Sequence, residues 1–322
     1  MMIMMVAMII MMIIMVILMI IMTKITKKKE PKKVLKKYGS SFFWASQFLG
    51  KNLSDQIARL YKFCRYVDNI ADSDAPNRES ILKNIKYHLI NDGKENQPDV
   101  VREFKELVVE SSISINAADD LMDGMLSDQN FTEVKDETEL LKYCHAVAGT
   151  VGIMVQKILN CRDIESTYFA IDLGVAMQLT NIARDVLEDA TNSRKYIPKT
   201  WLDVRPEKIA IKDIEDHEIV SRAIERTVSL ADQYYQSALI GIHYIPIKSR
   251  IAIAIALRLY REIGIKLVRD GSRWWEGRTI VGNTSKVKLS LYSLVDLLPL
   301  EIKPHDRNLH RKMNGLTGAQ KF

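Results

Sequence analysis

Helical periodicity is the feature that most constrains what this chain can fold into. From about residue 38 to residue 300, apolar side chains recur every three or four positions, as in LSDQIARLYKFCRYVDNIAD and YFAIDLGVAMQLTNIARDVLEDA. This spacing is typical of an amphipathic helix, whereas a half-buried strand would alternate apolar and polar residues. The chain has only 14 Gly and 8 Pro, too few for an architecture rich in turns. We therefore predict one all-α domain over residues 38–300.

Residues 1–22 differ from the rest of the chain. The segment MMIMMVAMIIMMIIMVILMIIM contains no charged residue, no Gly and no Pro. As a helix it would measure about 33 Å, which is enough to cross a bilayer. The basic segment at residues 23–37 would then stay on the cytoplasmic side. The repetitive composition is equally typical of translated sequence upstream of a true start at Met22, so both interpretations stay open.

Charge and cysteine content bound the location and the partners. The net charge of +6 favours anionic partners, either phosphates or a membrane surface. No aromatic interleaving or nucleic-acid motif accompanies the basic residues, so we expect no nucleic-acid binding. The three cysteines form no C-x-x-C pair, which favours a reducing compartment. We expect a cytoplasmic protein, peripheral to or anchored in the cytoplasmic membrane, with a polar, frayed tail at residues 301–322.

Two helical segments carry acidic residues at helical spacing. In the first, one face within about 60° carries Tyr61, Arg65, Asp68 and Asp72. In the second, one face within about 80° carries Gln178, Asn181, Asp185 and Asp189. A single acidic pair of this kind usually lies on a solvated face, where like charges repel. Here both pairs share stripes with apolar residues, where carboxylates need a neutralising partner.

The residue types on these two faces favour a hard metal ion. Carboxylate and amide oxygens, with no His or Cys among them, are the ligands that Mg²⁺ prefers. Two such faces opposite each other would hold metal ions that clamp a diphosphate between them. The run DDLMD at residues 119–123 is also acidic, but it lacks a preceding Tyr and Arg, so we interpret it as a bordering segment. We interpret His145, which lies beside small residues, as a packing residue.

Several blocks of the chain together resemble a known family. GSSFFWAS, LYKFCRYVDNIAD, YCHAVAGTVG and QLTNIARDVLEDA with SRKYIP are similar, in order and spacing, to the signature blocks of the squalene/phytoene synthase family. The resemblance runs from about Tyr38 to Leu300. It implies an all-α isoprenoid-synthase bundle with a central cavity for two prenyl diphosphates and a Mg²⁺ cluster, in which Mn²⁺ could substitute.

The resemblance also implies a role for individual residues. The implied metal ligands are Asp68, Asp72, Asn181, Asp185 and Asp189. The implied catalytic residues are Tyr61, Arg65, Tyr143 and Tyr260. The implied diphosphate-binding residues are Ser40, Ser41, Arg65, Gln178, Arg278 and Lys286, and Phe42 would line the cavity. Two positions depart from the pattern: Asn69 replaces a carboxylate of the first motif, which puts the metal load of that motif in question, and Tyr38 replaces a His found in some relatives.

The implied reaction joins two prenyl diphosphates head to head (1–1′) through a cyclopropyl diphosphate. The block from Gln178 to Pro198 resembles the carotenoid branch, so we expect two geranylgeranyl diphosphates to give phytoene without NADPH. The alternatives are a presqualene, squalene or dehydrosqualene synthase that uses farnesyl diphosphate. A catalytically inactive assembly factor is the non-enzyme alternative, which the intact acidic positions disfavour.

Overall fold

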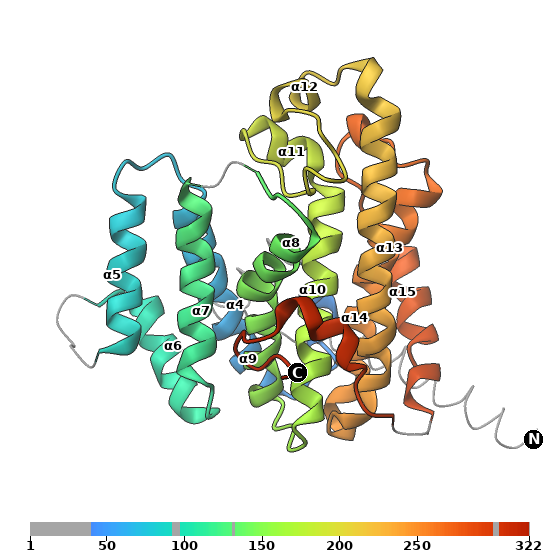
Figure 1. Ribbon diagram of the computed structural model, residues 1–322. Helices are drawn as coiled ribbons and strands as arrows, with labels where there is room; N and C mark the ends of the chain where they lie inside the picture. Colours follow the sequence, from blue (N-terminus) through green and yellow to red (C-terminus); the bar gives the residue numbers. More distant parts are fainter. Residues whose placement is uncertain (1–39, 92–96, 131–132, 299–302, 322) are drawn as a thin grey trace, which may run out of the picture.

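The computed structural model of the protein describes residues 40–91, 97–130, 133–298 and 303–321. Across these ranges the regular structure is helical, apart from one isolated bridge between Glu133 and Lys195. The predicted all-α fold is confirmed (Figure 1). Within the same ranges, no helix combines the length and the apolarity that crossing a membrane requires. Residues 1–22, for which a membrane span was one of two interpretations, lie outside the described part of the chain.

The helices follow one another through mostly short connections. In chain order the α-helices are α3 (Ser40–Ser46), α4 (Lys51–Ala71), α5 (Arg78–Ile90), α6 (Asp99–Glu110), α7 (Ile115–Ser127), α8 (Glu137–Cys144), α9 (Thr150–Ile158), α10 (Glu165–Arg184), α11 (Val186–Thr191), α12 (Pro206–Ala210), α13 (His217–Gly241), α14 (Ile247–Arg269) and α15 (Asn283–Tyr292). A π-helical turn, His145–Gly149, joins α8 directly to α9, so that residues 137–158 form one continuous rod.

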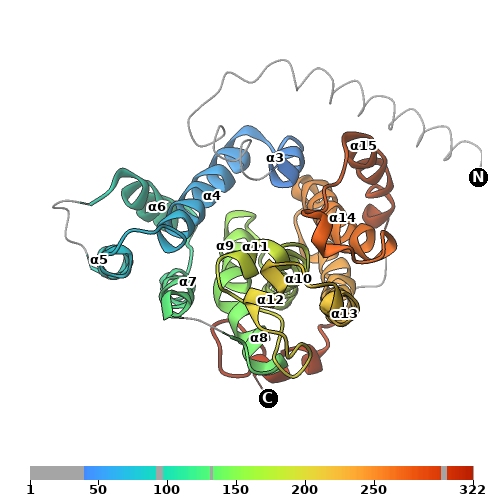
Figure 2. The same cartoon turned by 90° about the horizontal axis from the view of Figure 1, so that it is seen from above.

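The helices are grouped around α10. Figure 1 shows α4 to α7 on one side, α8 to α10 in the middle and α13 to α15 on the other side. Seen from above, α10 lies among α9, α13 and α14 (Figure 2), and its most extensive packing is against α13. Buried residues lie all round α10, as its largely apolar sequence requires. The C-terminal end of α10 leads directly into α11, which packs against α12.

The two faces of α4 separate packing from polar chemistry. One stripe is buried and includes Ala58, Phe63 and Val67. Phe63 stacks on Phe104 of α6 with ring centroids 3.9 Å apart, and burial of such a ring contributes about 1.5–3 kcal/mol. The other stripe carries the polar series at residues 61, 65, 68 and 72, which is half-buried or exposed. The packing of α4 therefore leaves its acidic face available for chemistry.

The rod of residues 137–158 and α10 approach so closely that only glycine fits at two positions. A Cβ atom on Gly152 would lie 2.1 Å from the carbonyl oxygen of Ala170. A Cβ atom on Gly174 would lie 2.3 Å from the carbonyl oxygen of Ala148. Because both obstacles are backbone atoms in close-packed helices, neither can move aside cheaply. The glycines therefore set the distance between the rod and α10.

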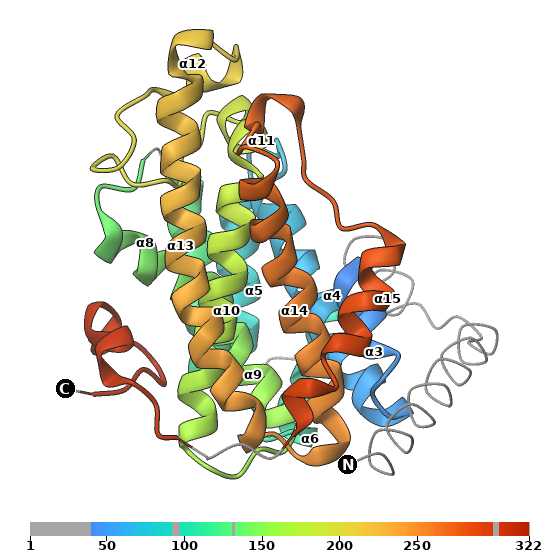
Figure 3. The same cartoon turned by 90° about the vertical axis from the view of Figure 1, so that its right-hand side faces the viewer.

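The C-terminal tail packs against the bundle, so the expected fraying is wrong for residues 303–321. His305 and His310 are buried, and their Nε2 atoms lie 2.9 and 3.0 Å from the carboxylate oxygens of Asp172 in α10. Burial alone would lower the pKa of His305, but the hydrogen bond to Asp172 holds this pKa above its usual value. The 3-10 segment Arg307–Met313 also contacts α8 (Figure 3). The buried polar residues of the tail, His305, His310 and Gln320, pair in the interior, where unpaired polar groups would be costly.

Candidate active site

Both acidic faces lie at one site, where α4 and α10 end. Asp72 directly follows α4, and Asp185 directly follows α10. Arg194, from the loop after α11, places its Nη1 2.7 Å from Oδ1 of Asp72. The charge of Arg194 also acts on Asp189 of α11, where it opposes a rise in the pKa of that carboxyl. The structure thus brings together both acidic faces that the sequence indicated.

The first acidic face is partly compensated by an arginine. Nη1 of Arg65 lies 2.5 Å from Oδ2 of Asp68, one turn further along α4. Burial, followed by the charge of Asp72, nevertheless raises the pKa of Asp68 to about 6. Asn69 is exposed and lies about 100° around the helix from Asp68. The departure at Asn69 therefore takes no oxygen away from the face that carries Asp68 and Asp72.

On the second acidic face, arginines neutralise the charge of one carboxylate well and that of the other poorly. Asp185 binds Arg184 through two contacts of 2.7 and 2.5 Å, and Nε of Arg278 lies 3.1 Å from its Oδ1. Burial and the charges of Asp185 and Glu188 raise the pKa of Asp189 to about 8. When burial and like charges raise the pKa of a carboxyl group, an added cation stabilises its ionised form.

Asn181 offers a further oxygen to such a cation. Its Nδ2 donates to Oε1 of Gln178 at 3.2 Å, which fixes the orientation of the amide. Its Oδ1 is buried and accepts no hydrogen bond from the residues that the structure describes. A buried acceptor without a donor is costly unless a cation or water satisfies it. Together with Asp185 and Asp189, this oxygen fits the hard ligand set of Mg²⁺.

Aromatic side chains from three helices meet beside the carboxylates. The ring of Phe42 lies 6.2 Å from that of Tyr61 and 4.8 Å from that of Tyr260, centroid to centroid. Tyr260 also bonds to Arg184, the partner of Asp185. Burial raises the pKa of Tyr61 to about 12. Its hydroxyl therefore stays protonated at neutral pH and can donate a hydrogen bond to an anion.

Three further residues of this site were not predicted from the sequence: Asp128, Arg194 and Tyr196. Asp128 directly follows α7 and is buried. The hydroxyl of Tyr196 lies 2.9 Å from both carboxylate oxygens of Asp128 and donates a hydrogen bond to them. Nη1 of Arg194 lies 3.4 Å from Oδ2 of Asp128. Tyr196 in turn stacks on Tyr143, with ring centroids 4.9 Å apart. These contacts connect the predicted catalytic Tyr143 to Arg194, and through it to the first acidic face.

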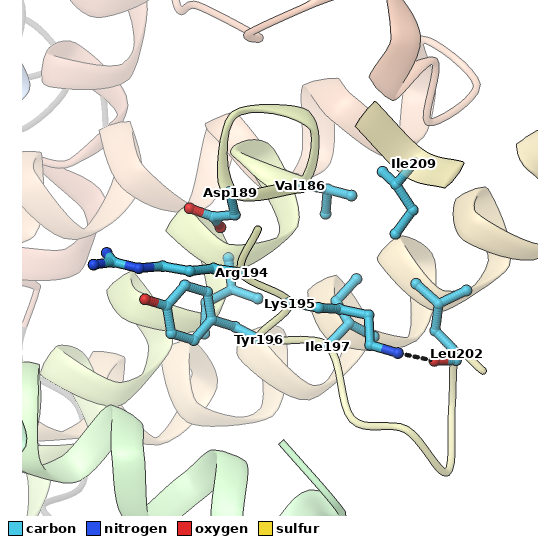
Figure 4. A pocket seen from close by; sticks show the side chains of 9 residues that line it. Val186, Asp189, Arg194, Lys195, Tyr196, Ile197, Leu202 and Ile209 are labelled. Carbon is cyan, nitrogen blue, oxygen red and sulfur yellow. Dashed lines mark hydrogen bonds between the residues drawn. The ribbon is translucent and has the colours of Figure 1, made fainter. Parts of the chain in front are cut away.

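A sequence signal for two of these residues does exist. Arg194 and Tyr196 belong to the block SRKYIP, which contributed to the resemblance without receiving any role. Figure 4 shows both side chains extending toward the side of Asp189, whereas Lys195 between them points the other way. Such alternation is what an extended segment dictates. Asp128 carries no such signal because it lies in a short 3-10 segment with no periodic partner.

The other predicted diphosphate-binding residues lie on the outer helices. Ser40 and Ser41 begin α3. Lys286 is buried in α15, and this burial lowers its pKa. Their contacts with a diphosphate stay predictions, as do those of Gln178 and Arg278.

The acidic run at residues 119–123 is engaged elsewhere. Nζ of Lys86 in α5 lies 3.2 Å from Oδ1 of Asp119 and also binds Asp123. His145 is buried, and its Nε2 lies 2.9 Å from the carbonyl oxygen of Thr317 in the tail. Both features therefore fit the structural interpretation that the sequence suggested.

A second cluster of potential metal ligands consists of Asp172, His305 and His310, whose ligand atoms lie within 4.8 Å of one another. The backbone N–H of Gln320 donates to Nδ1 of His310 at 3.0 Å. The proton of the neutral ring must then be on Nε2, which donates it to Asp172. A histidine that binds a metal through Nε2 instead donates from its other nitrogen. This cluster therefore suits a hydrogen-bonded latch for the tail better than a metal ion.

Metal binding at the acidic faces should tighten as the pH rises from about 6 to about 8. Carboxyl ligands must lose their protons to bind a cation. Burial and neighbouring negative charges raise the pKa of Asp68 to about 6 and that of Asp189 to about 8, so both ionise across this window. Titration with Mn²⁺ at several pH values, followed by electron paramagnetic resonance, measures the affinity. An affinity that stays constant would contradict the assignment of Asp68 and Asp189 as ligands.

Comparisons with known proteins agree with this geometry. The chain is 34% identical to a 15-cis-phytoene synthase from Enterobacter agglomerans, over 77% of this chain and 88% of the relative. It is 31% identical to a 4,4'-diapophytoene synthase from Staphylococcus haemolyticus, over 80% and 92% of the two chains. A solved dehydrosqualene synthase in complex with ligand has a TM-score of 0.71 and 26% identity, and the match covers 83% of this chain and 95% of that one.

The family model for squalene/phytoene synthase matches residues 35–292. These residues include both acidic faces, the aromatic side chains beside them and the loop that carries Arg194 and Tyr196. The fold, the site and the sequence match agree, and the chain belongs to the squalene/phytoene synthase family.

Proposed function

We propose that this protein condenses two molecules of geranylgeranyl diphosphate head to head and releases phytoene. As a member of its family it is a prenyltransferase that joins prenyl diphosphates head to head. The observation that carries the site assignment is that Arg194 contacts both acidic faces. Its side chain pairs with Asp72, and its backbone N–H donates to the carbonyl oxygen of Asp189 at 2.9 Å. The choice of the C20 substrate is supported by the match to the 15-cis-phytoene synthase.

Divalent cations would be held by the carboxylates and amide of the two faces, which are Asp68, Asp72, Asn181, Asp185 and Asp189. When bound, Mg²⁺ supplies positive charge that stabilises a departing diphosphate. Arg65 and Arg278 would contribute from the protein side, because a guanidinium presents a fork of donors that matches phosphate oxygens. Both arginines already contact carboxylates of the faces, so they lie where such a diphosphate would bind.

The aromatic group formed by Phe42, Tyr61 and Tyr260 would act on the carbon skeleton. Loss of diphosphate leaves an allylic cation, and aromatic faces attract cations through their quadrupoles. The cation is attacked by the C2–C3 double bond of the second prenyl chain, which leads to the cyclopropyl diphosphate. A second ionisation and rearrangement then give the 1–1′ bond. The apolar walls of the bundle must exclude water, because water would trap the cations as alcohols.

Two alternatives use the same site with the C15 substrate, farnesyl diphosphate. The first alternative is a dehydrosqualene synthase. Its support comes from the match to the 4,4'-diapophytoene synthase and from the similarity to the solved dehydrosqualene synthase. A squalene synthase would finish the reaction with hydride from NADPH, a cofactor that we propose is not used here. We further propose a cytoplasmic enzyme at the membrane surface, because the chain carries a net charge of +6 and the substrates are lipids.

Product analysis tests this proposal directly. The purified protein with Mg²⁺ should convert geranylgeranyl diphosphate to phytoene, and NADPH should change neither the rate nor the product. Farnesyl diphosphate in a parallel reaction should be the poorer substrate. C30 products alone, or a strict requirement for NADPH, would overturn the phytoene assignment. No product from either substrate would instead favour an inactive assembly factor.

A further inference from the structure

A line of hydrogen bonds leads from the site to a buried carboxylate to which the mechanism above gives no role. The hydroxyl groups of Tyr143 and Tyr196 bond to each other, and their rings are stacked with 19° between the planes. The hydroxyl of Tyr196 donates onward to both oxygens of Asp128 at 2.9 Å. Three side chains from three separate segments thus form one continuous chain of donors and acceptors.

Burial gives this chain of hydrogen bonds one open end. Asp128 and Tyr196 are each 7% exposed, whereas Tyr143 is half-buried. Tyr143 lies in the last turn of α8, directly before Cys144 and the π-helical turn His145–Gly149. Single π-turns of this kind occur frequently at functional sites. Tyr143 is therefore the most exposed of the three residues and the end of the line at which a substrate would meet it.

The charges around Asp128 suit a group that gains and loses a proton. Burial raises the pKa of Asp128 above that of an ordinary carboxyl, and the charge of Asp72 acts in the same direction. Arg194, 3.4 Å away, and the hydroxyl of Tyr196 act in the opposite direction and favour the ionised form. The carboxylates of Asp68 and Asp189 lie further off but also interact with it. Burial therefore makes Asp128 more basic than a solvated carboxylate, while the charge of Arg194 and the hydrogen bond from Tyr196 stabilise its ionised form.

Head-to-head condensation needs such a group. Closure of the cyclopropane ring requires that the cation lose a proton from carbon, whichever prenyl chain length is used. Water must be absent from the site, so the acceptor has to be part of the protein or of the substrate. The carboxylates of the two acidic faces serve as the predicted metal ligands, whereas Asp128 is not among them.

We propose that Asp128 is the terminal proton acceptor of the reaction, reached from Tyr143 through Tyr196. The C–H bond of the cation breaks, and its electron pair forms the new carbon–carbon bond of the ring. The released proton binds to the hydroxyl oxygen of Tyr143, while the hydroxyl protons of Tyr143 and Tyr196 each move one place toward Asp128. Asp128 becomes a neutral carboxyl and, when the products leave and water enters, releases the proton along the same route to solvent. This inference rests on the proposed function, because it needs the head-to-head reaction.

Tyr196→Phe is the sharpest test, since it keeps the stacked ring and removes only the linking hydroxyl. Asp128→Asn removes the acceptor at the end of the line. Tyr234→Phe is the matched control, because Tyr234 is also buried and bonded, but to the carbonyl oxygen of Leu309 in the tail. Each full-length variant is assayed with Mg²⁺ and prenyl diphosphate, either unlabelled or deuterated at C1. Circular dichroism and Mn²⁺ affinity are measured alongside.

Tyr196→Phe and Asp128→Asn should each lose about 10²- to 10⁴-fold in turnover, the range for a missing general base. Both should also show a larger C1 isotope effect than wild type, because proton removal becomes limiting. Mn²⁺ affinity should stay at the wild-type value, and Tyr234→Phe should keep wild-type turnover. If Asp128→Asn does not fold, Tyr196→Phe still decides the question.

Two results would overturn the relay. Wild-type turnover of Tyr196→Phe would show that another group, such as the diphosphate leaving group, accepts the proton. A loss of turnover with an unchanged isotope effect would show that Tyr196 and Asp128 have only a structural role, because proton removal would not have become slower. In both cases wild type still makes its head-to-head product, and the proposed function stands. If wild type made no such product from any prenyl diphosphate, the function and the relay would fail together.

Discussion

The Asp185→Asn variant is expected to turn over about a thousandfold more slowly than wild type. A metal ion that stabilises a leaving group is worth several kcal/mol, and each 1.36 kcal/mol changes a rate about tenfold. Asparagine keeps the size of the side chain but lacks the anionic charge that a cation requires. It also weakens the hold on Arg184 and Arg278, which both contact Asp185. Steady-state product formation measures the loss, and circular dichroism should show wild-type helix content.

Asp123→Ala is the matched control for Asp185→Asn, because it removes another carboxylate from a literal DDxxD run. Asp123 is exposed and bound to Lys86, and such surface pairs are worth at most about 1 kcal/mol. Its turnover should therefore stay close to that of wild type. If Asp123→Ala and Asp185→Asn lost activity equally, residues 119–123 would be part of the metal site and the present ranking of the acidic segments would be wrong.

Gly174→Ala should cause a large loss of stability, although it adds a single methyl group. The added Cβ would lie 2.3 Å from the carbonyl oxygen of Ala148, so the rod of residues 137–158 would have to move away from α10. Forcing extra volume into a close-packed interior costs about 1–3 kcal/mol, and more when backbone must shift. We expect a loss of about 3 kcal/mol, measured as the free energy of unfolding in urea.

Gly282→Ala provides the comparison for Gly174→Ala. A Cβ at Gly282 meets no heavy atom within 4 Å, and its φ of −70° suits any residue. Its free energy of unfolding should stay near the wild-type value. Equal stability of the two alanine variants would show that the rod and α10 are not held together as closely as these contacts require.

The two acidic faces, which the helical period predicted, lie on helices and at their ends. Asp68 and Asp185 belong to series spaced by three and four residues, so one period places each series on a single face. Asp128 and Arg194 follow α7 and α11, in segments with no period that could relate them to those faces. Their proximity depends on the three-dimensional path of two loops. The sequence contains no local signal for that path.

The C-terminal tail shows the same limit for the fold. Its polar composition is typical of a frayed end, and nothing near His305 suggests a partner. The partner is Asp172, which lies 133 residues earlier on the buried helix α10. Asp172 is the one charged residue in the apolar stretch of α10 at residues 169–177, and a buried carboxylate requires donors from somewhere. That requirement was visible in the sequence, but the identity of the donors was not.

Crystallography with Mn²⁺ tests most directly whether the two acidic faces hold the metal ions. The full-length protein is crystallised with Mn²⁺ and a non-reactive thio analogue of geranylgeranyl diphosphate, and the positions of the metal ions are determined. Anomalous scattering identifies Mn²⁺ without reference to the surrounding side chains. Peaks are expected beside Asp68 and Asp72 and beside Asn181, Asp185 and Asp189, with the diphosphate between them. Peaks at residues 119–123, or at the cluster of Asp172, His305 and His310, with none at the two acidic faces, would contradict this expectation.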